Sequence, residues 1–167
     1  LPEVVWKIPE FGTFSHNAYL LRQDGGAGAR NLVIINGEKE TGVSTFLIDD
    51  KIATGEMIMQ EKVAINPSEN AGGLHDKLML TGAQLVLKTL EAIKEGEVIT
   101  KSQKEAGNLK SAYKFTRENT RIDWNESLDN VYNFVRGLSP YPTAWTMLKS
   151  GTDEVMLKVY HTEHAPA

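Results

Sequence analysis

The stretch from Ile35 to Ile58 reads INGEKETGVSTFLIDDKIATGEMI. It contains two β-rich runs, from Val43 to Ile48 and from Glu56 onward, and each follows a Thr-Gly pair. Glycine adopts positive φ without the strain that a Cβ creates, so the chain can bend sharply at both pairs and present the polar loop between the runs at a strand end. Loops at strand ends are where α/β enzymes keep their functional groups. The stretch therefore predicts two strands and a functional loop of an α/β domain.

Composition limits the broad class of protein. The 167 residues are 41% hydrophobic and 24% charged, carry a net charge of −4 and include no cysteine. Such a chain can bury a core, and it has no disulfide, cysteine nucleophile or cysteine metal ligand. No run approaches the roughly 18 apolar residues of a membrane span, and the first residues do not resemble a signal peptide. We therefore expect a cytoplasmic protein without a membrane partner and, because the four histidines are scattered, without a metal site.

Hydrophobic periodicity predicts the elements around the central stretch. Strands are expected near 12–15, 42–48 and 56–65, with a short helix at 30–35. A long helix is expected from 70 to 94, ended by Gly96, with His75 as a capping or packing residue of its first turn. The apolar face of this helix is predicted to contain Leu78, Met79, Gly82, Leu85, Val86, Leu90 and Ile93.

A second, smaller unit is predicted from Arg121 onward. Asn125 can cap a helix that carries several apolar residues and ends at Gly137. The segment 155–160 alternates as a strand and follows a Ser-Gly-Thr-Asp turn. This pattern predicts a helix followed by the beginning of a β-structure.

A basic segment separates the two parts of the chain. Between Lys101 and Arg121 there are six basic and two acidic side chains, with Tyr113 and Phe115 among them. Such a segment can follow a phosphate backbone, and it can equally be a solvated linker. If it binds RNA, the residues expected to contact phosphates are Lys110, Lys114 and Arg117.

Several motifs occur in an order that resembles a known family. They are Asn36-Gly37 through Gly42-Val43, Ile52 to Glu56, Leu1 to Trp6, His75 to Leu78, Ile122-Asp123-Trp124 and Arg136 to Pro142. Over nearly the whole chain, these motifs are similar to the formyltransferases that use 10-formyltetrahydrofolate, and among them to the methionyl-tRNA formyltransferases.

The resemblance implies an α/β fold in two parts. Residues 1–96 would form the second half of a Rossmann-like catalytic domain, whose earlier part would lie upstream. Residues 97–120 would form a basic linker. Residues 121–167 would begin an OB-like β-barrel domain that binds tRNA.

The resemblance also implies a reaction and its partners. A formyl group would pass from 10-formyltetrahydrofolate to the amino group of methionyl initiator tRNA, in translation initiation, without a metal and in a monomer. Leu20, Leu21, Thr54 and Gly55 would contact the folate donor. The reaction passes through a tetrahedral oxyanion, so it needs hydrogen-bond donors for the oxygen and a base for the amine proton.

The catalytic positions depart from the family pattern. The family's Asn, His and Asp correspond to Ser15, Asn17 and Ala53, none of which is a base. The candidate catalytic residues that remain are His16, Asn17 and Asp50. A shift of one residue along a strand reverses the side chain, so we expect His16 to point away from the family's site.

Two classes of function therefore remain open. One is an enzyme, either a methionyl-tRNA formyltransferase or a related sugar-nucleotide N-formyltransferase. The Arg136 to Pro142 motif and the basic segment favour the tRNA enzyme. The other is a non-catalytic formyltransferase-like fragment or module, and the residues at 15, 17 and 53 predict that the chain as written does not transfer formyl groups.

Overall fold

The computed structural model describes residues 2–20, 28–48, 56–101 and 113–165. The chain divides into two compact units that interleave along the sequence. Unit 1 contains Leu1–Gly25, Glu40–Ala64 and Lys77–Ser111, and unit 2 contains Gly26–Lys39, Ile65–Asp76 and Ala112–Ala167. The chain therefore passes between the units several times, and the predicted division at 96 and 121 stays a prediction.

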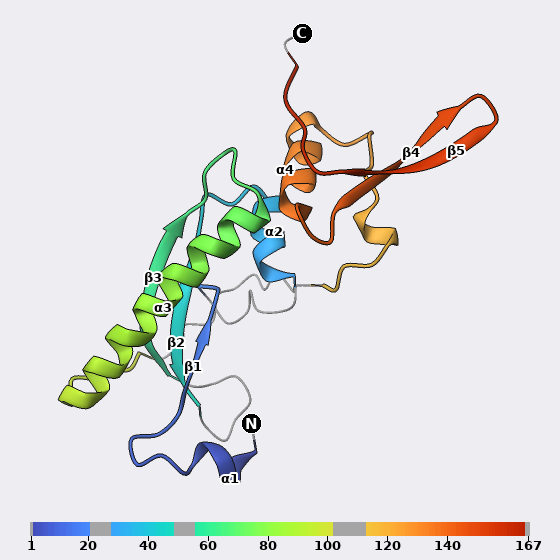
Figure 1. Cartoon of the computed structure of the whole chain (residues 1–167). Helices are drawn as coiled ribbons and strands as arrows, with labels where there is room; N and C mark the ends of the chain where they lie inside the picture. Colours follow the sequence, from blue (N-terminus) through green and yellow to red (C-terminus); the bar gives the residue numbers. More distant parts are fainter. Residues whose placement is uncertain (1, 21–27, 49–55, 102–112, 166–167) are drawn as a thin grey trace. The chain divides into compact units, whose positions relative to one another are not determined.

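Unit 1 is built on a three-stranded antiparallel sheet. Strands β1 (Phe14–Asn17), β2 (Glu40–Leu47) and β3 (Met57–Ala64) lie in the order β1-β2-β3 (Figure 1). The prediction of β2 and β3 is confirmed to within two residues, and β1 begins two residues later than predicted. A short helix, α1 (Glu3–Trp6), precedes the sheet.

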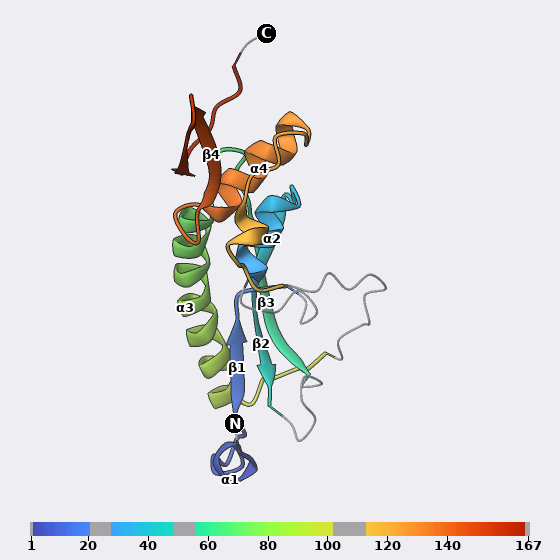
Figure 2. The same cartoon turned by 90° about the vertical axis from the view of Figure 1, so that its right-hand side faces the viewer.

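Helix α3 (Ala71–Glu95) confirms the predicted long helix. From Lys77 onward it belongs to unit 1, and it covers one face of the sheet (Figure 2). Its buried stripe follows the three- and four-residue spacing of one helix face. The buried positions of the stripe in unit 1 are Leu78, Gly82, Leu85 and Thr89.

Two residues predicted for this apolar face do not lie on it. Met79 is 56% exposed and Leu90 is 49% exposed. Each follows a buried residue directly, and one residue turns about 100° around a helix, so both side chains face away from the sheet. Asn70 caps the helix, because its Oδ1 accepts a hydrogen bond from the Gly73 N–H at 2.9 Å. Of the two roles predicted for His75, capping is therefore taken by Asn70.

A buried hydroxyl pair joins α3 to the sheet. The Oγ1 atoms of Thr45 on β2 and Thr89 on α3 are 3.0 Å apart, and both side chains are fully buried. The Thr89 hydroxyl donates to the Leu85 carbonyl at 2.8 Å, which leaves the Thr45 hydroxyl to donate to Thr89. Buried hydroxyls need such partners, because an unpaired one costs about 1–3 kcal/mol.

Unit 2 packs two helices against a hairpin. Helix α2 (Ala29–Ile35) lies against α4 (Leu128–Leu138), and β4 (Ala144–Ser150) pairs with β5 (Asp153–Val159) through a turn at Gly151. A 3-10 turn, η2 (Glu118–Thr120), precedes α4. The core contains Ile122, Val135, Leu138 and Ala144.

The predicted cap of α4 is wrong. Ser127 caps the helix, and its Oγ accepts a hydrogen bond from the Asn130 N–H at 3.2 Å. Asn125 donates instead to the carboxylate of Asp123. The prediction placed the start of the helix two residues too early, a common error because Ser and Asn are both good caps.

Candidate functional site

The residues of the candidate active site divide between the two faces of the unit 1 sheet. His16 pairs in register with Thr45, and Asn17 pairs with Ser44. Thr45 bonds to α3, so His16 shares the face that α3 covers. Ser15 and Asn17 lie on the opposite face, because strand side chains alternate. The structure therefore brings Ser15 and Asn17 together and separates both from His16.

A network of polar side chains occupies the face opposite α3. Asn17 Nδ2 donates to Ser15 Oγ at 3.2 Å. On the neighbouring strands, Gln60 Nε2 donates to Ser44 Oγ at 3.1 Å, and Ser44 Oγ donates to the Tyr19 carbonyl at 2.9 Å. Ser44 and Gln60 were not singled out from the sequence, since only the register Asn17–Ser44–Gln60 places them beside the β1 pair.

Leu20, a predicted folate contact, lies over the same face. Its carbonyl accepts hydrogen bonds from Ser44 Oγ and Gln60 Nε2. A Cβ at Gly42 of β2 would lie 2.3 Å from Leu20 Cδ2 and 2.3 Å from the Glu61 carbonyl oxygen. Glycine at position 42 therefore lets the Tyr19-Leu20 segment approach the strand closely.

His16 is held against helix α3. A Cβ at Gly82 would lie 2.4 Å from His16 Nε2, so the ring rests where α3 has no side chain. Partial burial there removes water from the imidazole and lowers its pKa below the usual value. The ring is therefore mainly neutral at neutral pH and lies on the face away from Asn17.

This arrangement supplies hydrogen-bond donors without a base. The Ser15 hydroxyl and the second N–H of the Asn17 amide can stabilise a developing oxyanion, whereas the donors of Ser44 and Gln60 are used within the network. None of these side chains accepts a proton near neutral pH. Among the described residues, that face holds no carboxylate or imidazole beside Ser15 and Asn17. Leu21, Asp50, Ala53, Thr54 and Gly55 lie outside the described residues, so their predicted roles stay predictions.

Two of the predicted RNA contacts, Lys114 and Arg117, are among the described residues, and both belong to unit 2. Arg117 and Arg121 each place their guanidinium 5.5 Å from the centre of the Trp145 ring. Trp145 Nε1 donates to the Arg117 carbonyl at 2.7 Å, which fixes the ring against this segment. Lys114 does not take part in these contacts with Trp145; together with Arg30, it lines a cavity. Lys110 lies outside the described residues.

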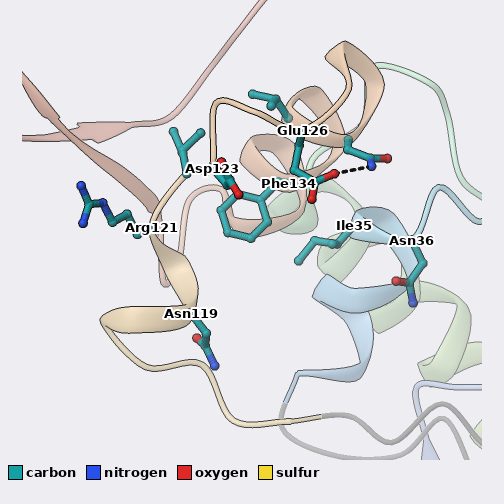
Figure 3. A pocket seen from close by; sticks show the side chains of 10 residues that line it. Ile35, Asn36, Asn119, Arg121, Asp123, Glu126 and Phe134 are labelled. Atoms are coloured by element: carbon teal, nitrogen blue, oxygen red, sulfur yellow. Dashed lines mark hydrogen bonds between the residues drawn. The ribbon is translucent and has the colours of Figure 1, made fainter.

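A third feature of unit 2 is an acidic cavity of about 510 Å³. Figure 3 shows Phe134 near its centre, with polar side chains around the ring. Glu126 accepts a hydrogen bond from Asn130 at 2.9 Å, and hydrogen bonds from Asn125 hold the pKa of Asp123 below its usual value. The lining contains two carboxylates, Asp123 and Glu126, and one cation, Arg121. Its net negative charge makes this cavity unsuitable for a phosphate.

The described part of the chain contains neither a metal-binding cluster nor a membrane-spanning helix. No group of three or more His, Asp or Glu side chains is arranged there to hold a metal ion. No helix among these residues has the length and apolar character needed to cross a membrane.

Family comparisons assign the two parts of the chain. The model of the formyl transferase family matches residues 4–90, and that of the formyl transferase C-terminal domain matches residues 114–167. The chain belongs to the formyl transferase family. Its mixed helix-and-sheet structure contains residues of the formyl transferase domain followed by residues of the C-terminal domain.

Curated relatives narrow the comparison within the formyl transferases. The chain is 50% identical over 163 residues to the methionyl-tRNA formyltransferase of Flavobacterium johnsoniae, a match that covers 98% of the chain and 52% of the relative. It is 46% identical over 170 residues to that of Bacteroides fragilis, covering 99% and 52%. The chain thus spans about half the length of the curated relatives it matches.

Solved formyl transferase structures share the fold at lower identity. An N-formyltransferase from Helicobacter canadensis, in complex with folinic acid and dTDP-3-aminofucose, has a TM-score of 0.64 at 23% identity, covering 84% of this chain and 56% of its own. HypX from Aquifex aeolicus, in complex with tetrahydrofolic acid, has a TM-score of 0.70 at 21% identity, covering 87% and 25%. At these identities the likeness concerns the fold alone.

Proposed function

We propose that the protein acts in the transfer of a formyl group from 10-formyltetrahydrofolate to the amino group of methionyl initiator tRNA. The observation that carries the proposal is the 50% identity, over 98% of the chain, with a methionyl-tRNA formyltransferase. Because the chain spans half of that relative, its donor, its tRNA substrate, its monomeric state and its place in the cytoplasm are proposed by analogy. A sugar-nucleotide substrate has less support, since the sugar-bound neighbour is only 23% identical.

The proposed roles follow the two parts of the chain. In unit 1, the face with Ser15 and Asn17 receives the formyl group, and the donors there hydrogen-bond the oxyanion of the tetrahedral intermediate. Leu20, with Leu21, Thr54 and Gly55, contacts the folate. In unit 2, Lys114 and Arg117, with Lys110, bind tRNA phosphates.

We further propose that the chain with these residues at positions 15, 17 and 53 binds its substrates but transfers the formyl group slowly. The methionine amine must lose a proton as it attacks the formyl carbon, and a positioned base contributes about 10²- to 10⁴-fold to such a step. Ser15 and Asn17 supply no base, and His16 lies on the opposite face of the sheet. Asp50 is the remaining candidate carboxylate, because position 53 holds alanine.

A chimera tests the proposal. The chain replaces the matching half of the F. johnsoniae relative, and formyl-methionyl-tRNA is measured with 10-formyltetrahydrofolate as donor. We expect transfer by this chimera to be at least about 100-fold slower than by the relative, because the base is missing. The substitutions Ser15→Asn, Asn17→His and Ala53→Asp, introduced together, should restore most of the activity.

Controls separate folding from chemistry. Tryptophan fluorescence and the unfolding midpoint of each chimera show whether it folds, and methionyl-tRNA binding shows whether the substrate site is intact. Failure of a folded, tRNA-binding triple variant to transfer would contradict the proposed function. Full activity in the unsubstituted chimera would instead assign the base to Asp50 or His16, and Asp50→Asn and His16→Gln would identify which.

A further inference from the structure

We propose that a basic cavity in unit 2 binds one unstacked nucleotide of the RNA substrate, with its phosphate between Arg30 and Lys114 and its base on Tyr141. The inference rests on the proposed function for the identity of the RNA. The cavity is lined in part by Arg30, His75, Lys114, Phe115, Pro140 and Tyr141. All of these residues belong to unit 2.

The cavity has the size and lining of a small-ligand site. Its volume is about 660 Å³, within the range of about 300–1,000 Å³ that such sites occupy. Its walls include apolar side chains such as Phe115, Pro140 and Pro142. Polar side chains share the lining with these apolar ones, and they include Arg30, Asn31, His75 and Lys114. Such groups fix the orientation of a ligand in an otherwise apolar site.

Two cations reach the cavity without a neutralising partner among the described residues. Neither Arg30 nor Lys114 forms an ion pair with a described carboxylate. The acidic side chain of the lining, Asp76, has its carboxylate 3.6 Å from His75 Nδ1. In a protein of net charge −4, this concentration of positive charge favours an anionic group such as a phosphate.

Close packing brings the two cations to one cavity, although they lie 84 positions apart in the sequence. A Cβ at Gly28 would lie 2.9 Å from Phe115 Cε2 and 2.9 Å from the Tyr113 carbonyl oxygen. Only glycine leaves room for the 113–115 segment to lie directly on the chain at the start of α2. Lys114 and Arg30 are therefore held at the same cavity by backbone packing rather than by their own side chains.

Tyr141 supplies an exposed aromatic surface on a fixed backbone. Its side chain is 82% exposed, while its carbonyl accepts a hydrogen bond from Asn31 Nδ2 at 3.3 Å. The same Asn31 amide donates to the Gly137 carbonyl at 2.8 Å, and the Thr143 N–H donates to Leu138 at 2.8 Å. A ring presented in this way can stack on a base of any sequence, because every base has a π-face.

The combination of groups selects a nucleotide over simpler anions. Inorganic phosphate would use the two cations and leave the Tyr141 ring uncovered. The acidic cavity shown in Figure 3 provides the contrast within the same unit, because its two carboxylates would repel a phosphate. Of the three cavities described in unit 2, this one has two cations in its lining, whereas each of the other two has Arg121 with two carboxylates.

The test measures binding of a fluorescein-labelled hexa-adenylate to the 167-residue chain at several salt concentrations. Tyr141→Ala should weaken binding by about 5- to 100-fold with little change in the salt dependence, because it removes stacking and no charge. Tyr141→Phe should bind like the unsubstituted chain. Arg30→Ala and Lys114→Ala should each reduce the slope of log K against log salt by about 0.7.

Lys149→Ala is the matched control, since it removes one exposed lysine of unit 2 outside the cavity and should leave the slope nearly unchanged. The unfolding midpoint of each variant shows that it is folded. Equal affinity of folded Tyr141→Ala and the unsubstituted chain, or an unchanged slope in both cation variants, would overturn the inference. The oligonucleotide carries no methionine, so this result does not depend on formyl transfer, and the chimera assay can fail while this test succeeds.

Discussion

At the residue scale, His16 predicts a pH dependence of stability. Partial burial against α3 lowers its pKa in the folded protein, so the unfolded chain takes up this proton at a higher pH than the folded one. Stability is therefore full above the usual histidine pKa, about 6.5, and falls as the pH decreases from there toward the lowered folded value. Urea unfolding of the unsubstituted chain and of His16→Gln, at pH values from 5 to 8, checks this. The stability difference between the two should shift in favour of the variant at pH 5, and parallel curves would contradict the prediction.

At the element scale, two helical glycines should respond oppositely to alanine. Helices α2 and α4 cross closely at Gly137, where a Cβ would lie 2.6 Å from Ile35 Cγ1. Gly137→Ala should therefore destabilise unit 2 by about 1–3 kcal/mol, as overpacking does. At Gly73 of α3 the nearest atom would be 3.6 Å away, so Gly73→Ala should be neutral or stabilise by up to about 1 kcal/mol through helix propensity. Denaturant unfolding measures both, and a Gly137→Ala variant as stable as Gly73→Ala would show that the helices do not pack as described.

At the scale of the whole molecule, the uneven charge distribution makes the proposed tRNA binding testable. The net charge is −4, yet six basic residues gather between Lys101 and Arg121. Replacing Lys110, Lys114 and Arg117 together with alanine should weaken methionyl-tRNA binding and flatten its salt dependence, by about one unit of slope for each lost phosphate contact. Filter binding at several salt concentrations between about 50 and 300 mM, over which screening increases, provides the measurement. A slope equal to that of the unsubstituted chain would leave the segment as a solvated linker.

Local chemistry made much of the fold predictable. Strands β2 and β3 and helices α3 and α4 occur where periodicity predicted them, because that signal depends on residues close in sequence. The turn predicted at Thr41-Gly42 is wrong, since Gly42 lies within β2 and pairs with Lys62. The other errors occur where two nearby residues suit the same role equally well. Ser127 rather than Asn125 caps α4, and Met79 lies beside the buried stripe of α3 rather than in it.

The sequence by itself determined the family, a strand within two residues of β1, and the absence of a base at positions 15 and 17. It also predicted that His16 and Asn17 face opposite ways, since alternation is a local property of a strand. Only the tertiary structure decided that α3 covers the His16 face, that Ser44 and Gln60 join Asn17, and that Lys114 reaches the cavity of Arg30. These contacts join residues far apart in the chain. They arise from the register of the strands and from the close approach at Gly28, so a local sequence pattern cannot predict them.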